Sequence, residues 1–349
     1  MNMEVNIYMP YYIISINEKE LWDKYIQKAA VFDFYHTWYY HSLEKSGTPF
    51  LFVYHRENDF IALPLIKRRI EDTAYFDCTS VYGYAGPVAN VPFNDLSEDI
   101  IAGFKLALSD FLKNENIITV FSRLHPLINQ QLLLNRFGGI YNNGRTVAVD
   151  LTKTIEDQRA KYRRSIRQKV KQLRRKGFVV KEAACDDEVK EFARIYNENM
   201  IKVNAASYYF FDEQYFFDLL HADDFHSKLL LAYYEDKITS GGVVTCSNNI
   251  MQFHLAATSN DFLSEAPMKL LFDEAACVGK AMGMRYLHLG GGVGGREDSL
   301  FDFKSGFSDL YFNFNTWRYI VDLPVYNNLV DQYGKNINNG GGRFPLYRS

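Results

Sequence analysis

The sequence predicts an α/β (α+β) chain of two domains, and three observations support this. The chain has 349 residues, which is long for a single hydrophobic core. Each half contains a two-strand hairpin, a later helix and a strand that closes near a histidine, His125 in the first half and His288 in the second. The most charged segment, a predicted basic helix at residues 155–177, lies between the halves. We therefore expect domains at residues 1–150 and 151–349, related by an internal duplication, with the basic helix in the second.

Apolar periodicity predicts the elements of the first half in order. Apolar positions at helical spacing give helices at residues 17–27, 32–44, 96–113 and 128–137. Strand-like runs occupy residues 49–56, 59–69, 117–123 and 146–149, the first two joined by a turn at residues 57–59. The mixture of the two element types is what an α/β domain requires.

The second half repeats this layout around three consecutive strands. A helix at residues 189–200 precedes strand-like runs at 227–236, 237–247 and 249–259, with polar turns at Asp236-Lys237 and Asn248-Asn249 that predict an antiparallel meander. A helix at 268–282 begins near Pro267. A strand at 286–289 then enters five glycines, and a last strand covers residues 316–323.

Composition excludes several classes of protein. Hydrophobic residues make up 47% and charged residues 23%, as in soluble globular proteins. The formal net charge of -3 argues against a protein that coats nucleic acid. The four cysteines show neither a CxxC nor a metal-ligand spacing, so we expect reduced thiols, no metal site and a cytoplasmic protein. No apolar run is long enough to span a bilayer.

The glycine-rich stretch at residues 284–307 is the most unusual feature of the chain. Glycines at 290, 292 and 295 match GxGxxG, but no amphipathic helix of a dinucleotide-binding unit follows them. The cluster FDFKSGF then sets Lys304 among aromatic side chains. A stretch of backbone without side chains, followed by a lysine among aromatic residues, favours a binding cleft. A glycine-rich surface turn is the alternative.

The strand at residues 249–259 carries the first candidate base. Strict alternation puts Gln252, His254, Ala256 and Thr258 on one face and Met251, Phe253, Leu255 and Ala257 on the other. Histidine side chains can act as general bases near neutral pH, so His254 is a candidate general base, while a histidine that bonds a neighbouring carbonyl is the structural alternative.

Three further patterns suggest ligand contacts. The start of the helix at residue 268 offers free N–H groups that suit a pyrophosphate, although most helix starts bind only water. The basic helix suits phosphates, nucleic acid or an anionic membrane, or is a solvated helix between domains. The aromatic runs SVYGYAGP and SYYFF either belong to the core or stack on sugars and bases.

The order of the motifs resembles a known family. The succession RRSIRQKVKQLRRKGFVV, YNENM, SYYFF, HLAATS, EAP, LHLGGG and FDFKSGF resembles the Fem-type (FemABX-like) acyltransferases, over nearly the whole chain. The resemblance implies two tandem GNAT-like domains, each a mixed, largely antiparallel sheet flanked by helices, and acyl transfer to an amine. Known members move an aminoacyl group from tRNA to a peptidoglycan precursor. Their RGPxxD pattern reads AGPVAN here at residues 85–90, without Arg or Asp.

The chain also resembles two-domain nucleotide-sugar N-acyltransferases of the FdhC type, and we favour that branch. The resemblance implies an acyl-CoA co-substrate, no tightly bound cofactor, and a dTDP-type amino sugar as acceptor in surface polysaccharide biosynthesis. We prefer these partners to tRNA. An aminoacyl-tRNA-dependent peptidoglycan enzyme and a non-catalytic nucleotide- or glycan-binding module are the alternatives.

The resemblance also implies where the ligands bind. The donor's pantetheine arm lies where the strands before and after the helix at residue 268 part. Direct attack of a neutral amine on the thioester then needs a proton acceptor, which is a side chain, water or the substrate itself. The candidate bases are His254, then His125 and His288 at strand ends facing the cleft. The expected donor contacts are Met268, Lys269, Leu270, Ala257, Thr258 and Ser259. The expected acceptor contacts are Tyr82, Tyr84, Arg163, Arg164, Arg167, Tyr208, Tyr209 and Lys304.

Overall fold

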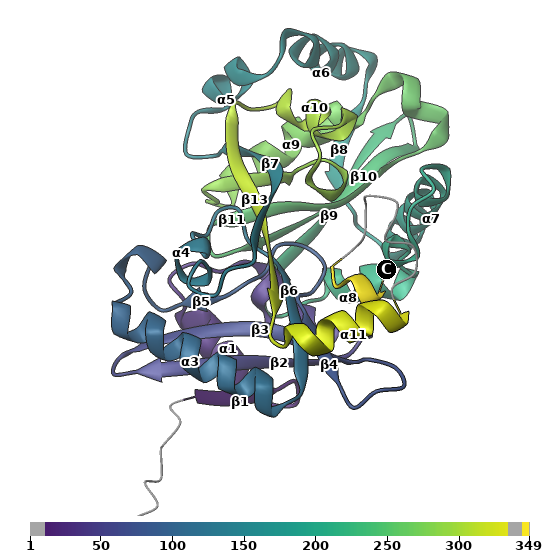
Figure 1. Cartoon of the computed structure of the whole chain (residues 1–349). Coiled ribbons are helices and arrows are strands. Elements are labelled where there is room, and N and C mark those ends of the chain that lie inside the picture. The colour runs from purple at the N-terminus through teal and green to yellow at the C-terminus, as the bar shows by residue number, and fades with distance from the viewer. Residues whose placement is uncertain (1–10, 334–343, 349) are drawn as a thin grey trace, which may run out of the picture. The chain divides into compact units, whose positions relative to one another are not determined.

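The computed structural model describes residues 11–333 and 344–348, apart from the side chain of Tyr208. The chain forms two compact units (Figure 1): unit 1 comprises residues 1–143 and 314–349, and unit 2 comprises residues 144–313. The chain passes between them twice, within β7 (Ile140–Asp150) and within β13 (Leu310–Ile320). The sequence prediction assigned residues 314–349 to the second half, whereas in the structure they belong to unit 1.

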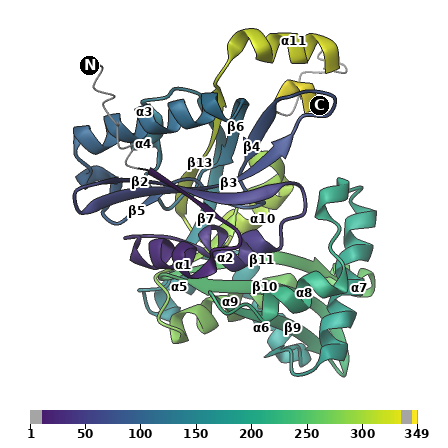
Figure 2. The ribbon, with the colours of Figure 1, turned by 90° about the horizontal axis from the view of Figure 1, so that it is seen from below.

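Unit 1 is a mixed, mainly antiparallel sheet with helices on both faces (Figure 2). Its strand order is β1-β2-β3-β4-β6-β13, in which only β4 and β6 are parallel, and β5 pairs with β3. Helix α3 packs on one face through Phe104 and Leu108, and α1 covers the other through Trp22 and Ile26. The remaining bounds are β1 Tyr11–Ser15, α1 Lys19–Lys28, α2 Trp38–Ser42, β2 Thr48–Arg56, β3 Asp59–Arg69, β4 Phe76–Thr79, β5 Val88–Ala89, α3 Glu98–Asn114, β6 Ile117–Arg123, α4 Gln131–Leu134 and α11 Leu323–Tyr333.

Unit 2 has the same architecture. Its strand order is β7-β12-β11-β10-β9-β8, and β11 and β12 are the parallel pair. Helix α9 packs on one face through Leu271 and Phe272, and α7 covers the other face, where Phe192 lies against Gly241. The bounds are α5 Ile155–Lys161, α6 Arg164–Lys176, β8 Val179–Glu182, α7 Asp186–Lys202, α8 Glu213–Leu220, β9 His226–Tyr234, β10 Lys237–Ser247, β11 Ile250–Thr258, α9 Met268–Ala281, β12 Tyr286–Gly290 and α10 Ser299–Ser305.

The two units share one topology. In each, four antiparallel strands are followed by a long helix and a fifth strand parallel to the fourth: β4, α3 and β6 in unit 1, and β11, α9 and β12 in unit 2. The sixth strand of each unit comes from the other half of the sequence, because β13 pairs with β6 and β7 pairs with β12. This common order agrees with the expected duplication, and the exchange of last strands explains why residues 314–349 belong to unit 1.

The meander of unit 2 forms where the sequence predicts it. Asn248 and Asn249 both have positive φ and make the two-residue turn between β10 and β11, which suits asparagine. The turn before β10 falls at Glu235-Asp236, one residue earlier than expected. Pro267 begins α9 and Gly177, in the left-handed region, ends α6.

The predicted basic helix at residues 155–177 is in fact two helices, α5 and α6. Tyr162 and Arg163 have extended backbone between them, with ψ of 141° and 144°. The break has a tertiary cause, because the Tyr162 ring is buried against Phe307 and the Arg163 N–H donates to the Gly306 carbonyl at 2.8 Å. Within the described ranges, no helix is both long and apolar enough to cross a membrane.

Candidate active site

The strands β11 and β12 of unit 2 begin as a parallel pair and then part. They pair at only three positions, Ile250 with Tyr286, Met251 with Leu287 and Gln252 with His288. Beyond Gln252, β11 continues alongside β10 as far as Thr258, while β12 follows β7. The edge of β11 from residue 253 onward is therefore not paired with β12, and the expectation that these two strands are neighbours that diverge is confirmed.

His254 lies at the point of divergence on a β-bulge. Val243 and Val244 of β10 are adjacent, but their partners in β11 are Leu255 and Phe253, so His254 is the extra residue. A bulge locally bends the strand and re-aims its side chain, and bulges are common beside active sites. His254 is half-buried, and its Nε2 lies 3.4 Å from the Tyr215 hydroxyl of α8.

The bulge overturns the predicted alternation of β11. Residues paired across two strands point to the same face of the sheet. Ala256 pairs with Gly242, and a Cβ added to Gly242 would point toward Leu271 of α9. Ala257 pairs with Gly241, and a Cβ added to Gly241 would point toward Phe192 of α7, on the other face. Met251 and Phe253 lie in the core with α9. Leu255 and Ala257 therefore do not share the face of Met251 and Phe253, because the extra residue shifts the alternation by one position.

His288 was expected to face the cleft, but the structure does not place it there. It is fully buried in the middle of β12, and its Nδ1 donates to Gln252 Oε1 at 2.7 Å. This bond crosses the last paired position of β11 and β12, so it holds the strands together just before they part. Gln252 was predicted only as a residue on the same face as His254. Its partner on β12 depends on the tertiary fold.

The glycine-rich stretch folds back on itself and on β7. An added Cβ at Gly144 would lie 2.0 Å from the Gly295 carbonyl oxygen, and one at Gly292 would lie 2.2 Å from Asp298 Oδ1. The Asp298 carboxylate accepts from the N–H groups of Val293, Leu300 and Phe301 and so caps α10. The glycines are thus required by close backbone approach inside a compact loop.

Lys304 lies on α10 and reaches back to this loop. Its Nζ donates to the Gly291 carbonyl at 2.8 Å, one residue after the end of β12. Burial lowers the pKa of Lys304 to about 8, although the nearby Asp298 carboxylate opposes the shift. The structure therefore places a cation whose charge changes slightly above neutral pH beside the end of the diverging strand.

The start of α9 offers fewer free donors than expected. The N–H of Lys269 donates to the Ala266 carbonyl at 3.2 Å, and that of Leu270 donates to the Pro267 carbonyl at 2.9 Å. Ala257, Thr258 and Ser259 form the end of β11 and the residue after it, and the Ser259 N–H donates to Thr239 of β10. These residues lie along one strand end and the following helix start in unit 2, but two of the three helix N–H groups already have acceptors.

The predicted arginines differ in their environments. Arg163 pairs with Asp302 at 2.8 Å and donates to the Ser305 hydroxyl, both on the helix that carries Lys304. Arg164 and Arg167 lie on the exposed side of α6, and Arg167 donates to the Ala160 carbonyl. Tyr209 is half-buried, and its carbonyl accepts from the Tyr196 hydroxyl. The side chain of Tyr208 lies outside the described part of the structure.

His125, Tyr82 and Tyr84 lie in unit 1, and His125 does not face a cleft there either. Its ring is buried, with Nδ1 accepting from the Leu127 N–H and Nε2 2.9 Å from Asp33 Oδ2. The Tyr84 ring meets Phe314 edge-on, and the Tyr82 carbonyl accepts from the Tyr40 hydroxyl. These contacts build the interior of unit 1.

Among its described residues, unit 1 shows no open strand divergence like that of unit 2. After β4 the chain stays against β6, because the N–H groups of Ser80 and Ala85 donate to Phe121 and Arg123, and Ala85 forms a parallel bridge with Leu124. The buried Gln130 amide donates to the carbonyls of Ala85 and Pro87 and holds the segment in place.

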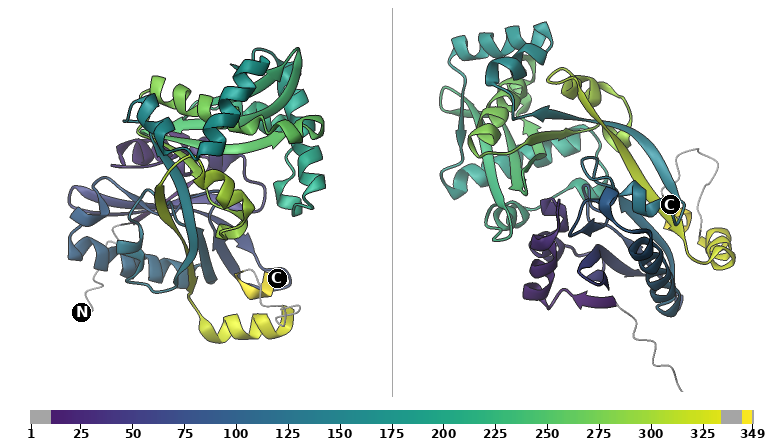
Figure 3. Two further views of the ribbon diagram at one scale, coloured as in Figure 1. Left: turned by 90° about the horizontal axis from the view of Figure 1, so that it is seen from above. Right: turned by 90° about the vertical axis from the view of Figure 1, so that its left-hand side faces the viewer.

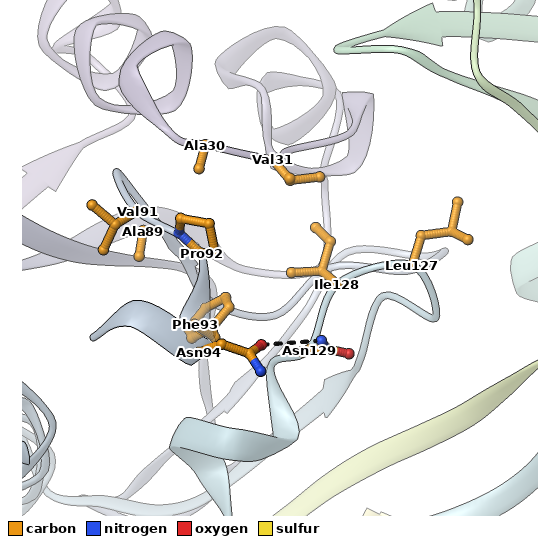
Figure 4. Close-up of a pocket in the computed structure, with 10 residues that line it drawn as sticks. All are labelled: Ala30, Val31, Ala89, Val91, Pro92, Phe93, Asn94, Leu127, Ile128 and Asn129. Atoms are coloured by element: carbon orange, nitrogen blue, oxygen red, sulfur yellow. Dashed lines mark hydrogen bonds between the residues drawn. The ribbon is translucent and has the colours of Figure 1, made fainter. Parts of the chain in front are cut away.

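Unit 1 also contains a small apolar pocket of about 110 Å³ (Figure 4). Val31, Pro92 and Ile128 line it, with Asn129 donating to Asn94 at its edge. Binding sites for drug-sized ligands are typically several times larger. The pocket fits no more than a few apolar atoms and does not define the site.

The chain is similar to known proteins in both sequence and fold. Residues 160–305 match the Acetyltransferase (GNAT) domain family, and this range lies wholly within unit 2. The crystal structure of FemX has 12% identity and a TM-score of 0.70, covering 91% of this chain and 99% of that one. The structure of L-PGS from Bacillus licheniformis has 17% identity and a TM-score of 0.57, covering 90% and 96%. No curated protein matches the sequence.

These findings define the class of the protein at the level of fold. The chain contains a GNAT-type acetyltransferase domain in unit 2, unit 1 repeats its strand topology, and the structure of FemX resembles the chain over most of its length. The expected tandem GNAT-like architecture is thus confirmed. The GNAT domain supports an acyltransferase that uses acyl-CoA as its co-substrate.

Proposed function

We propose that the chain is an N-acyltransferase that moves an acyl group from a coenzyme A thioester to the amino group of a nucleotide-linked amino sugar. The observation that carries this proposal is the parting of β11 and β12 at the bulged His254, inside the segment that matches the GNAT family. Where the strands part, the sheet leaves backbone N–H and C=O groups without a partner strand. The extended arm of the donor can form hydrogen bonds with these groups, as an added strand would.

The reaction needs no covalent enzyme intermediate. The neutral amine attacks the thioester carbonyl, the new C–N bond forms, and the tetrahedral intermediate collapses with cleavage of the C–S bond. The nitrogen loses one proton to His254, and the leaving thiolate takes one proton from solvent. Backbone N–H groups of β11 beyond Gln252 stabilise the developing oxyanion, and the fixed orientation of amine and carbonyl supplies much of the rate enhancement.

The donor's pyrophosphate is placed at the start of α9 in this proposal. Helix N-termini favour anions because their N–H groups and dipole carry partial positive charge. Met268 supplies its backbone N–H and Lys269 adds a cation, while the end of β11, from Ala257 to Ser259, precedes this helix. Because the N–H groups of Lys269 and Leu270 already have backbone acceptors, the Lys269 ammonium carries much of the interaction.

Lys304 is the residue we assign to the acceptor. It lies next to the end of β12, and its neighbour on the same helix, Asp302, is already paired with Arg163. A half-buried ammonium recognises an acceptor phosphate more strongly than an exposed one, since water screens it less. A nucleotide-linked sugar supplies a diphosphate, which matches the charge of this site.

A product assay tests the proposal directly. Acetyl- and hydroxyacyl-CoA are offered against several dTDP- and UDP-linked amino sugars, and in a separate arm aminoacyl-tRNA is offered with a peptidoglycan precursor. We expect an acylated nucleotide sugar by mass spectrometry, together with a rise in melting temperature on addition of coenzyme A. Product only in the aminoacyl-tRNA arm would replace this assignment with the Fem-type activity. Ligand protection without any acylated product would indicate a binding module.

A further inference from the structure

The segment from α5 to the end of α6 carries ten cations, and the structure divides them into two groups. Six form salt bridges with carboxylates of unit 2. These are Arg159 and Arg174 with Asp273, Lys161 with Asp309, Arg163 with Asp302, and Lys169 and Lys176 with Glu265. For the other four, Arg164, Arg167, Lys171 and Arg175, the described residues provide no carboxylate partner.

These four residues form a single line along α6, which we call the cationic stripe. They are spaced by three, four and four positions, and at 100° per residue they fall within an arc of about 80°. All four are exposed, and α6 lies on the outside of unit 2 (Figures 1 and 3). The opposite side of α6 is buried through Ile166, Val170 and Leu173.

The flanks of the cationic stripe are electrically neutralised. On one side Arg163 and Arg174 are paired with Asp302 and Asp273, and on the other Lys169 and Lys176 share Glu265. Positive charge without a partner is therefore confined to the crest of the helix.

We propose that the cationic stripe docks unit 2 on an anionic membrane surface. A plane that touches a helix meets only its crest, and here the cationic stripe runs along the crest for about 16 Å, the length of eleven residues. Basic clusters on a helix bind anionic lipid headgroups in this way, and each Lys or Arg strengthens binding roughly fivefold. Because the apolar side of α6 is used in the core, the contact is electrostatic and does not involve insertion of the helix.

The geometry favours a flat surface over a single strand of RNA. Proteins that hold single-stranded nucleic acid combine cations with aromatic side chains on which bases stack. The exposed uncharged positions of α6 between the stripe residues are Ser165, Gln168 and Gln172, none of them aromatic. A strand that wrapped around the helix would also meet the carboxylates on both flanks.

Vesicle co-sedimentation of the full chain tests the proposal. Wild type is compared with the variant R164Q/R167Q/K171Q/R175Q on vesicles of phosphatidylcholine containing about 30% phosphatidylglycerol, and on phosphatidylcholine alone. The control K28Q/K45Q/K113Q/K237Q removes the same charge from exposed lysines that are scattered over the chain. We expect the stripe variant to lose at least about 100-fold in partition coefficient, while the control loses far less.

The outcomes separate the sources of binding. Wild-type binding should require phosphatidylglycerol and weaken as salt rises from about 50 to about 300 mM. Equal loss in the stripe and control variants would overturn the proposal, because net charge alone would then explain binding. So would absence of wild-type binding, or a stripe-dependent affinity for single-stranded RNA without one for vesicles. Unchanged melting temperatures of both variants verify that they are folded.

Discussion

The Nδ1 of His288 lies 2.7 Å from Gln252 Oε1, across the last position at which β11 and β12 are paired. Both side chains are buried, so this bond forms in a region of low dielectric where hydrogen bonds between side chains are strong. The next residue but one along β11 is the bulged His254. The bond thus fixes where the strands part, and with it the position of the candidate base.

Replacement of His254 by alanine should lower turnover without unfolding the protein. A positioned general base typically contributes 10²–10⁴-fold, so we expect a fall of at least about tenfold in kcat. The melting temperature should change little because the side chain is half-buried. The matched control is His226→Ala, which removes an exposed histidine at the start of β9. Equal turnover in the two variants would exclude His254 as the base.

Affinity for the acceptor should depend on the protonation of Lys304. Since burial lowers the pKa of Lys304 to about 8, the side chain is mostly charged at pH 7 and mostly neutral above pH 9. If the ammonium binds an acceptor phosphate, KM for the acceptor should rise about tenfold or more as pH increases through this range. Steady-state kinetics at several pH values measure this.

Two variants separate the charge of Lys304 from other effects of pH. Lys304→Met should show the high KM at every pH, and Lys304→Arg should keep the charge and remove the rise, because guanidinium does not titrate here. Parallel KM profiles for wild type and Lys304→Met would show that the charge does not contribute to acceptor binding.

Asp273 should be essential for the stability of unit 2. Its carboxylate is 1% exposed and accepts from both Arg159 and Arg174, which attach α5 and α6 to α9. Asp273→Ala should cost about 3 kcal/mol, the lower end for a broken buried pair, because both arginines stay partly exposed. Chemical denaturation measures the loss.

The control for Asp273 is an exposed ion pair in the same unit. Asp309 is 65% exposed and pairs with Lys161, so Asp309→Ala should cost less than about 1 kcal/mol. Similar losses in the two variants would show that the buried carboxylate has no special role.

Gly292 should tolerate no side chain although its backbone is ordinary. Its φ is -82°, but an added Cβ would lie 2.1 Å from the Arg296 carbonyl oxygen and 2.2 Å from Asp298 Oδ1. Gly292→Ala should displace the cap of α10, destabilise the protein by about 1–3 kcal/mol and lower activity by moving Lys304. Thermal melts and kcat/KM measure the two effects.

A neighbouring glycine provides the contrast. Gly294 has a φ of 65° and nothing within contact distance of an added Cβ, and asparagine adopts this region readily. Gly294→Asn should cost less than about 1 kcal/mol and leave activity near that of wild type. The interpretation fails if Gly294→Asn is as damaging as Gly292→Ala.

Local signals predicted much of unit 2 because their causes are local. Asn248 and Asn249 accept positive φ, Pro267 suits a helix start, and Gly177 suits a helix end. Each acts within a few residues of itself, so the meander and α9 follow from sequence. The resemblance over nearly the whole chain predicted two GNAT-like domains, and the family match at residues 160–305 agrees for unit 2.

The candidate site was predicted less completely than the fold. The pattern indicated His254 as a candidate, but strict alternation gave the wrong faces for Leu255 and Ala257 because it could not include a bulge. Likewise, no pattern along the chain reveals that His288 bonds Gln252, or that Tyr215 lies beside His254. A bulge and its contacts arise from the pairing of β11 with β10, which sequence periodicity does not specify.

The sequence by itself determined the elements, the turns and the presence of a strongly basic segment, because propensity and short-range sterics act between near neighbours. Tertiary structure decided which strands exchange between the units, where β11 leaves β12, and which of ten cations keep an unbalanced charge. Those properties depend on atoms brought together from distant positions, as when Asp273 neutralises two arginines about a hundred residues away.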